Sequence, residues 1–547
     1  MVKNLDGVLF KELISYGIKN LKLHETIVND MNVFPVPDGD TGTNMTMTLM
    51  NGYEAIRNEE GSLSDLASKF GYAVAFGARG NSGVISSQFF KGFSESFVNT
   101  HNADAKLFVK ALEKGVAEAY LSVSKPTEGT ILTVVREATE HVRKQLDEGK
   151  LRSVNEVIDA FLQKAEASLK NTPELLPILK SSGVVDSGGA GILYFFQGMK
   201  KYIMHEEIEL QEVEATTASA IDYSAFNRQT KFEFGYCTEV LLQLTDGKAE
   251  FDYEAFKNII ETLGDSVATV YTDEKVKVHV HTMQPEQVLS FCHQYGEFLT
   301  MKIENMSVQH TQKQEAEESK EEVFPHSPWA VVAVASDAML EETFKQMGAR
   351  AVIQGGQLCN PSVQDFLSVL EKVNADHIIV FPNNKNVILT ALQAKKLYAN
   401  GKVTVIHSAS MAECYAALGL VDYDSEKPED VVQVIHEAIE RIDTISISQA
   451  VRGTVYDQVS IEIGDYVAIE RSHIVGADKT LEGVVIPMID KYLAQEEKDV
   501  VTFFAGQNIA EQELEELLSY VEENYYYVDC GVVQTDSTVY SLILSFE

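Results

Sequence analysis

The chain has 547 residues, of which 45% are hydrophobic and 23% are charged. A single hydrophobic core stops growing at about 250 to 300 residues, so this length predicts two to four domains. With 82 acidic against 45 basic side chains, the formal net charge is -37, and such a surface argues against nucleic acid or a bare anionic membrane as a partner.

The amino-terminal third carries a helical pattern. Between about residues 6 and 202, apolar side chains recur at helical spacing, as in Phe10, Leu13 and Ile14. This pattern predicts an all-α domain over residues 1–205. Short turns that are rich in glycine or acidic residues interrupt it, and functional residues are often found on such loops. These turns are 38–43, 77–83, 127–130 and 186–191.

A smaller domain of mixed structure follows a linker. Residues 206–220 become acidic and then small, which is linker composition. After them, apolar and polar residues alternate in 239–244 and 276–281, which predicts strands, and helical segments lie between and after these strands. We therefore expect a small α+β domain over residues 222–310.

The third region alternates strands with helices. A charged run, residues 311–322, has no apolar stripe and separates this region from the second domain. Beyond it, apolar runs such as 330–335, 377–381 and 403–406 alternate with helical patterns, which is typical of a parallel, doubly wound sheet. The sequence predicts an α/β domain over residues 324–547 and a multidomain protein as a whole.

The cysteines and the amino terminus bear on the cellular location of the protein. The five cysteines are scattered and show no disulfide-like spacing. No signal-peptide pattern opens the chain, and no apolar run approaches the roughly 18 residues that span a bilayer. We expect a soluble, cytoplasmic protein with reduced thiols and no direct membrane insertion.

Two carboxylates stand on one tight turn. Asp38 and Asp40 flank Gly39, which allows the backbone to fold sharply. Neighbouring carboxylates are unfavourable without a cation, and Mg²⁺ commonly binds one or two carboxylates together with substrate phosphates. The amides of residues 41–44 open a helix, where they could face phosphate oxygens. The same pentapeptide is also an ordinary turn, so the residues alone leave both interpretations open.

A second glycine-bearing turn, residues 77–83, also precedes a helical run. Ser82 and Gly83 stand where they could contact nucleotide phosphates. A helix-packing corner is the alternative, because one glycine motif is weakly specific. Arg79 either binds phosphate or pairs with a neighbouring acid, and the sequence does not distinguish these roles.

A third group of residues is of the kind that binds zinc. His279 and His281 stand two apart on a predicted strand, so they share a face, and Cys237 lies on or just before a neighbouring strand. One thiolate and two imidazoles are three of the four ligands that zinc takes. Glu239, His310, water or a substrate group could complete the site. The alternative is that these residues merely share a small domain, because no Cys-x-x-Cys signal is present.

Taken together, three segments resemble one family. Residues 32–45, 77–85 and 184–191 are similar to motifs of the catalytic, ATP-binding component of bacterial fatty acid kinases. The amino-terminal domain of that family is related to the nucleotide-binding, DhaL-like domain of dihydroxyacetone kinases. The resemblance covers essentially the whole chain, and it implies a helical barrel that holds ATP and two Mg²⁺ ions in the first domain.

The resemblance also implies roles for individual residues. Asp38 and Asp40 would hold Mg²⁺ and carry the catalysis. The first aspartate of the related kinases has no clear counterpart, and Asn32 is the nearest candidate to replace it. The phosphate path would be lined by Thr41, Gly42, Thr43, Asn44, Ser82 and Gly83, with Thr130 and Asp186 nearer the nucleoside. Cys237, His279 and His281 correspond to a zinc-type site in the middle domain of the family.

The implied reaction transfers the ATP γ-phosphate to a fatty acid on a separate fatty-acid-binding carrier protein. The product is an acyl phosphate for phospholipid synthesis, and the carboxy-terminal domain would hold the carrier. A carboxylate with a pKa near 4.3, the value for Glu, is already ionised at neutral pH and needs no general base. Positioning and charge neutralisation then suffice, as in phosphoryl transfer generally.

Two other functions fit the same sequence. One is a kinase for a small polyol such as dihydroxyacetone, although a hydroxyl acceptor needs a base. The other is a nucleotide-sensing regulatory scaffold without turnover. We also expect a homodimer.

Overall fold

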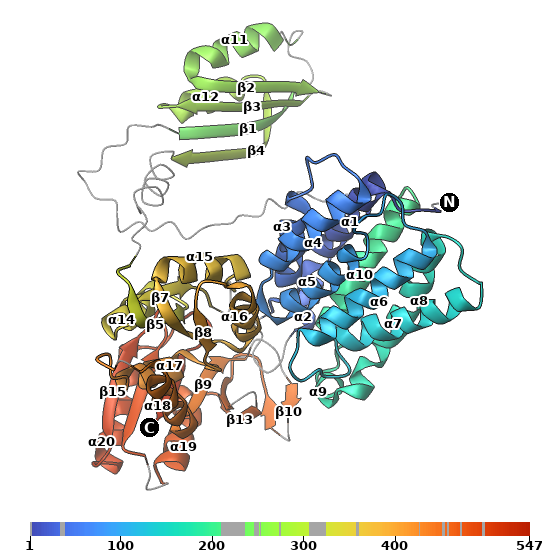
Figure 1. The fold of residues 1–547 in the computed structure, drawn as a ribbon. Helices are drawn as coiled ribbons and strands as arrows, with labels where there is room; N and C mark the ends of the chain where they lie inside the picture. The colour runs from blue at the N-terminus through green and yellow to red at the C-terminus, as the bar shows by residue number, and fades with distance from the viewer. Residues whose placement is uncertain are drawn as a thin grey trace. The chain divides into compact units, whose positions relative to one another are not determined.

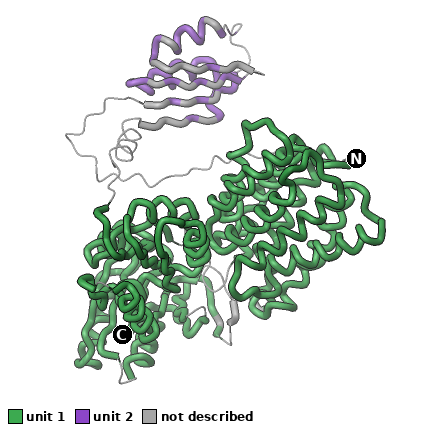
Figure 2. Tube along the Cα trace, viewed as in Figure 1, with its two compact units in different colours: residues 1–212, 323–547 green, residues 213–322 purple. Residues whose placement is uncertain are grey.

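The computed structural model separates the chain into two compact units. One unit comprises residues 1–212 and 323–547, and the other comprises residues 213–322 (Figure 2). The residues described are 3–32, 39–208, 236–244, 251, 253–272, 275–305, 324–356, 360–425, 427–450, 454–456, 459–470, 473–494 and 498–547. Figure 1 shows helices alone in the amino-terminal part of the first unit and strands with helices elsewhere.

The amino-terminal part of the larger unit is helical, as predicted. Its core is rich in phenylalanine, and the rings pack edge to face, with 5.7 Å between the centroids of Phe10 and Phe70 and 4.7 Å between those of Phe90 and Phe195. The helices are α1 (Gly7–Leu23), α2 (Glu25–Met31), α3 (Thr41–Glu54), α4 (Leu63–Phe76), α5 (Gly80–Glu95), α6 (Ala105–Leu121), α7 (Ile131–Asp147), α8 (Val154–Leu175), α9 (Pro177–Ser182) and α10 (Ser187–Ile203).

The four turns singled out in the sequence each open a helix, namely α3, α5, α7 and α10. Asp40 is the N-cap residue of α3. Thr130 caps α7 by accepting from the amide of Leu132 at 3.4 Å, and Asp186 caps α10 by accepting from the amide of Gly189 at 2.7 Å. Side-chain oxygens at these positions satisfy amides that the helix leaves without partners.

The smaller unit is an antiparallel sheet with helices, which confirms the predicted α+β class. Its strands are ordered β2-β3-β1-β4. Apolar residues on alternate positions, including Val240, Leu242, Val278 and Val280, form its core with Phe256. The elements are β1 (Tyr236–Leu244), α11 (Tyr253–Leu263), β2 (Asp265–Thr272), β3 (Lys275–Thr282), α12 (Pro285–Cys292) and β4 (Gly296–Asn305).

The carboxy-terminal part of the larger unit begins with a parallel sheet in the order β6-β5-β7-β8. The chain moves from β5 to β6 on one side and then to β7 on the other, so the order reverses between β5 and β7. Ligands of such sheets bind at the carboxyl ends of the strands at this reversal. The elements are β5 (Ser327–Ala335), α14 (Ala338–Gln346), β6 (Ala351–Gln354), α15 (Val363–Val373), β7 (Ala375–Phe381), α16 (Lys385–Leu397), β8 (Lys402–Val405), α17 (Met411–Gly419) and α18 (Pro428–Arg441).

The strands that follow form a second, mostly antiparallel sheet, where the sequence analysis expected the parallel sheet to continue. Its order is β13-β12-β9-β16-β14-β15. Two residues separate Glu470 at the end of β12 from His473 at the start of β13, and so short a connection permits only antiparallel pairing. The elements are β9 (Asp443–Gln449), β12 (Tyr466–Glu470), β13 (His473–Asp478), α19 (Leu481–Leu493), β14 (Val500–Ala505), α20 (Glu511–Asn524), β15 (Asp529–Gln534) and β16 (Leu542–Phe546). Strands β10 (Thr454–Tyr456) and β11 (Val459–Ile461) form a separate two-stranded sheet. The α/β class of this domain is confirmed.

The helical and α/β parts of the larger unit share a hydrophobic core. Ala78 and Val84, at the start of α5, are buried in one cluster with Phe366 of α15 and residues of the parallel sheet. An antiparallel bridge joins the backbones of Arg79 and Ser362. The two parts therefore meet at the glycine-bearing turn that the sequence marked as a nucleotide site.

Across the residues described, no helix combines the length and the apolar character that a membrane span requires.

Candidate active site

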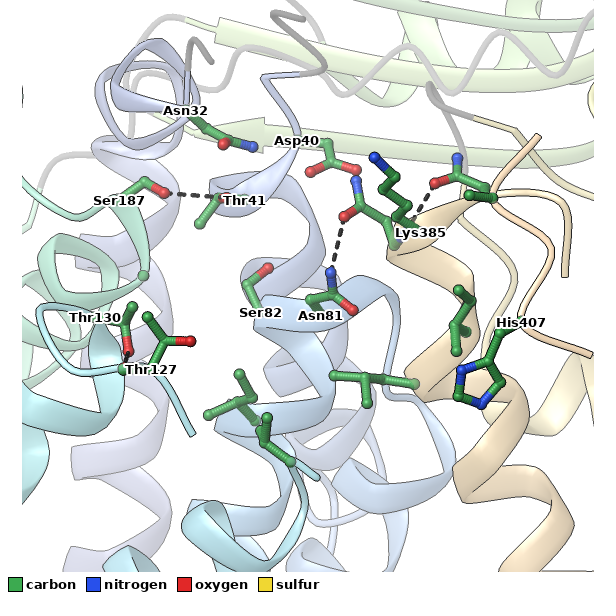
Figure 3. A pocket seen from close by; sticks show the side chains of 18 of the residues that line it. Asn32, Asp40, Thr41, Asn81, Ser82, Thr127, Thr130, Ser187, Lys385 and His407 are labelled. Atoms are coloured by element: carbon green, nitrogen blue, oxygen red, sulfur yellow. Dashed lines mark hydrogen bonds between the residues drawn. The ribbon is translucent and has the colours of Figure 1, made fainter. Parts of the chain in front are cut away.

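A cavity of about 660 Å³ lies in the larger unit, between its helical and α/β parts (Figure 3). On the helical side, most of its lining residues come from the first turns of α3, α5, α7 and α10 or stand directly before them, and others end α2 or follow α6. On the α/β side, they come mainly from α16, from the segment between β8 and α17, and from strands β9 and β12. Among the lining residues are Asn32, Asp40, Thr41, Asn81, Ser82, Thr130, Asp186, Ser187, Asn384, Lys385, Asn386, His407 and Ser410.

Oxygen atoms of the kind that bind Mg²⁺ gather at one end of this cavity. Asp40 stands directly before α3, Asn32 ends α2, and Thr41 is the first residue of α3. The hydroxyl of Ser187, from the first turn of α10, donates to Thr41 Oγ1 across 3.2 Å. Carboxylate, amide and hydroxyl oxygens are hard ligands, so the donor set fits Mg²⁺.

The amides at the start of α3 are engaged inside the protein. The Asn29 Oδ1 atom accepts from the amides of Gly42 at 2.7 Å and Thr43 at 3.1 Å. A Cβ atom on Gly42 would lie 2.6 Å from the carbonyl oxygen of Glu25, so α2 packs directly on this turn. Asn29 thus caps α3 from a distance, a role that the sequence analysis missed.

Asn44 and Gly83 belong to the packing around the cavity rather than to its lining. The Asn44 side chain is buried and accepts a hydrogen bond from Asn360 at 3.4 Å. At Gly83, a Cβ atom would lie 2.5 Å from Thr48 Oγ1, so α3 and α5 approach closely there. Nucleotide contacts of Gly42, Thr43, Asn44 and Gly83 stay predictions.

The cavity wall also carries a perturbed carboxyl group, Asp186, which directly precedes Ser187 in the sequence. Removal from water raises the pKa of Asp186 to about 6, while hydrogen bonds from the amides of Gly189 and Ile131 act in the opposite direction. Thr130 lies beside this group on the cavity wall, and its hydroxyl donates to the carbonyl of Thr127 at 2.8 Å. A protein carboxyl group that titrates near neutral pH is typical of functional sites.

The α/β part brings a cation to the cavity. Lys385 begins α16, directly after the loop at the carboxyl end of β7, and it is the one lysine or arginine among the lining residues that the structure describes. Figure 3 draws its side chain in the same part of the cavity as Asp40 and Asn81. Asn81 Nδ2 donates to Asn386 Oδ1 across 3.0 Å. The sequence analysis indicated no catalytic role for this part of the chain.

The structure resolves the two interpretations of Arg79. Its guanidinium Nη1 donates to the carbonyl oxygen of Asn360 at 2.9 Å and lies 3.4 Å from Asp365 Oδ2. Both partners belong to the α/β part, so Arg79 forms an ion pair between the two parts of the unit and does not line the cavity.

Several predicted site residues lie outside what the structure describes. Asp38 is one of these residues, and the side chains of Cys237, His279 and His281 are likewise not described. The backbone register places Cys237 directly opposite His281 and Glu239 directly opposite His279. Among the residues that the structure describes, no group of three or more His, Cys, Asp or Glu residues is arranged to hold a metal.

Three family models match the chain. The FakA-like carboxy-terminal domain of fatty acid kinases matches residues 330–547, and the FakA-like middle domain of the same proteins matches residues 233–313. A DAK2 domain matches residues 35–201.

The chain is also similar to a full-length relative and, over parts of its length, to solved structures. Protein YloV of Bacillus subtilis is 34% identical over 557 residues and covers 100% of both chains. DegV, a fatty acid binding protein from Bacillus subtilis, is 10% identical with a TM-score of 0.32 and covers 40% of this chain and 99% of its own. The dihydroxyacetone kinase from C. freundii, in complex with AMP-PNP and Mg²⁺, is 19% identical with a TM-score of 0.29 and covers 37% of this chain and 35% of its own.

Proposed function

Because this chain belongs to the FakA-like family of fatty acid kinases, we propose that it phosphorylates the carboxylate of a fatty acid, which a separate fatty-acid-binding protein presents. Family membership and the DAK2 domain make the chain a phosphotransferase of the kinase type that uses ATP. The acyl acceptor and the residue roles below are our proposal.

One observation carries this proposal. The first turns of α3, α5, α7, α10 and α16 line a single cavity, with Asp40 on its helical side and Lys385 on its α/β side (Figure 3). Helix amino termini carry partial positive charge and favour phosphate groups. The cavity therefore combines a carboxylate for a divalent cation with a lysine and amide dipoles for phosphate oxygens.

We assign roles to the cavity residues from the ligands that Mg²⁺ prefers. Asp40 and Asn32 would hold the cation, together with Asp38, and the bound ion would neutralise phosphate charge. Thr41 and Ser82 line the polar end of the cavity, where the phosphates would lie, and Thr130 and Asp186 line the region proposed for the nucleoside. Lys385 would stabilise the negative charge that develops on the transferred group.

The reaction needs no proton transfer. A carboxylate oxygen of the fatty acid forms a bond to the γ-phosphorus, the bond from this phosphorus to the β,γ-bridging oxygen breaks, and ADP leaves with the electron pair. The acceptor is already ionised at neutral pH, so catalysis requires positioning and electrostatic stabilisation alone. The product is an acyl phosphate.

The middle domain would hold a structural or catalytic Zn²⁺ through Cys237, His279 and His281. The register that pairs Cys237 with His281 supports this assignment, because directly opposite positions in an antiparallel pair have Cβ atoms about 5 Å apart. A carrier protein would dock on the α/β domain, and we further propose a homodimer.

A trapping assay tests the proposed reaction. The purified chain is incubated with ATP, Mg²⁺, a fatty acid and a candidate fatty-acid-binding protein, and acyl phosphate is captured with hydroxylamine. We expect hydroxamate only when all components are present. A parallel reaction with dihydroxyacetone as the sole acceptor distinguishes a polyol kinase from a fatty acid kinase. The proposal would be refuted if ADP is released with dihydroxyacetone while a loaded carrier gives no hydroxamate.

A further inference from the structure

Asn360 extends from the α/β part of the larger unit into the turn that carries Asp40. Its Nδ2 atom donates to Asp40 Oδ2 across 2.5 Å and to Asn44 Oδ1 across 3.4 Å. The side chain is only 2% exposed. A residue 320 positions away in the sequence therefore contacts the proposed cation ligand directly.

Chemistry determines which end of the Asn360 amide faces Asp40. An ionised carboxylate only accepts hydrogen bonds, so the NH₂ group must face it. The carbonyl oxygen then points elsewhere, and Asn360 Oδ1 is buried without a hydrogen-bond partner among the residues described. Asn81 Oδ1, on the cavity wall, is also buried and unpartnered among those residues. Native proteins seldom leave such acceptors unsatisfied, and the Asn81 oxygen belongs to a residue of the cavity wall, where a bound polar group could satisfy it.

Backbone contacts fix the position of Asn360. The amide of Val363 donates to the carbonyl of Ala78 at 3.2 Å, and the Arg79 guanidinium holds the carbonyl of Asn360 at 2.9 Å. The absence of a side chain at Gly80 leaves room for the amide, because a Cβ atom there would lie 3.2 Å from Asn360 Nδ2. The segment is thus anchored at the carbonyl of Asn360 and again three residues further along the chain.

We propose that Asn360 is a positioning residue for the cation site of this kinase, an inference that rests on the proposed Mg²⁺ and ATP chemistry. Its N–H group holds one oxygen of the Asp40 carboxylate, and this contact orients the carboxylate so that its other oxygen can face the cation. Partners that orient metal ligands typically change metal affinity or activity by 10- to 100-fold when they are removed. The α/β domain is then a component of the cation site as well as a carrier-binding domain.

Cation binding by the full-length protein tests this inference without any acceptor. Mn²⁺ is titrated into protein saturated with AMP-PNP, and free Mn²⁺ is measured by electron paramagnetic resonance. Asn360→Ala removes the amide, and Asn360→Leu removes it while nearly preserving the side-chain volume. We expect both variants to bind Mn²⁺ about 10- to 100-fold more weakly than the wild type, with cooperative thermal unfolding retained.

Asp365→Asn is the matched control. It weakens the ion pair to Arg79, which also joins the two parts of the unit, but it does not contact Asp40. We expect its Mn²⁺ affinity to stay within about twofold of the wild type, because Asp365 is 47% exposed and ion pairs of surface carboxylates contribute little.

Three results would overturn the inference. Wild-type affinity in Asn360→Leu would mean that packing alone matters. An equal loss in Asp365→Asn would mean that general loosening of the interface is the cause, and failure of the wild type to bind Mn²⁺ with AMP-PNP would mean that the cation site does not exist. The proposed acceptor is tested separately by the trapping assay. If Mn²⁺ binding depends on Asn360 but no hydroxamate forms, only the proposed acceptor is refuted.

Discussion

Asn81 and Asn386 join the first turns of two helices that lie 305 positions apart in the sequence, through a hydrogen bond of 3.0 Å from Nδ2 to Oδ1. The amino termini of α5 and α16 therefore meet at the same cavity (Figure 3). Their partial positive charges add to that of Lys385. Under the proposed function, these charges would offset part of the repulsion between an anionic nucleotide and a protein with a formal net charge of -37.

Replacement of Lys385 tests this electrostatic role. Lys385→Ala should lower kcat by about 100-fold or more, because a positive charge aimed at the transferred phosphate is typically worth two to three orders of magnitude. Acyl phosphate formation with a loaded carrier is the measurement. Lys395→Ala is the control, since this lysine lies in the last turn of the same helix, is exposed, and does not line the cavity. Equal turnover in the two variants would remove Lys385 from the mechanism.

Asp40 should be indispensable to catalysis. Asp40→Asn preserves the shape of the side chain and removes the charge that a divalent cation needs. We expect turnover to fall by more than about 100-fold, because even the partners of metal ligands are worth 10- to 100-fold. Circular dichroism and thermal unfolding should show an intact fold. Turnover near the wild-type value would refute the metal role of this carboxylate.

The sequence predicted the local features of the site and missed the distant ones. The turn residues Asp40, Thr130 and Asp186 were identified because short acidic or glycine-bearing turns interrupt a helical pattern and because the sequence resembles a kinase family, and both signals lie in short stretches of sequence. Asn29 was not identified, because its contacts with the amides of α3 depend on how α2 packs back. An asparagine within a helical run carries no signal of such a role.

The residues that the α/β part contributes to the site could not be predicted from sequence patterns for the same reason. Lys385 follows β7 in a polar loop at the carboxyl end of a parallel strand, and that position was the one available hint. Asn360 lies 320 residues from Asp40, and only tertiary packing brings the two together. The second sheet was also missed, since strand direction depends on connection length as much as on composition.

The raised pKa of Asp186 predicts that this carboxyl group makes the free energy of unfolding depend on pH. The folded-state pKa of about 6 exceeds the ordinary value of 3.8, so the folded protein binds this proton more tightly than the unfolded chain does. The ionised group therefore costs stability above pH 6, and the cost disappears as the pH falls from about 6 to about 4.

Asp186→Asn should accordingly stabilise the protein by at most about 3 kcal/mol at pH 7.5 and by at most about 1 kcal/mol at pH 4.5. Thermal unfolding of both proteins at the two pH values measures this difference. Asparagine is also a good N-cap residue, so α10 should keep its start. A stabilisation that is equal at both pH values would contradict the raised pKa.

Metal analysis tests the proposed zinc site in the middle domain. The double variant His279→Ala, His281→Ala removes two of the three proposed ligands, so we expect bound zinc to fall from about one equivalent to none. Inductively coupled plasma mass spectrometry of protein purified without chelators gives the zinc content. His293→Ala in α12's C-cap position is the control because it removes a histidine of the same domain outside the proposed set. Unchanged zinc in the double variant would exclude these ligands.

Gly80 and Gly149 provide a matched pair for the close approach at the domain interface. Both adopt positive φ, of 60° and 72° respectively, so alanine at either position is strained by about 1–2 kcal/mol. A Cβ atom on Gly149 would meet nothing within 4 Å, whereas one on Gly80 would lie 2.6 Å from Asn44 Nδ2. Asn44 and Asn360 are almost fully buried and have no room to withdraw.

Gly80→Ala should therefore destabilise the protein more than Gly149→Ala, by a further amount of about 1–3 kcal/mol, which is the usual cost of overpacking. It should also displace Asn360 from Asp40 and weaken Mn²⁺ binding in the presence of AMP-PNP, while Gly149→Ala leaves that affinity unchanged. Urea unfolding and the Mn²⁺ titration measure the two effects. Equal losses of stability in the two variants would mean that backbone strain alone fixes the glycine at position 80, and that the α/β part does not press on this turn.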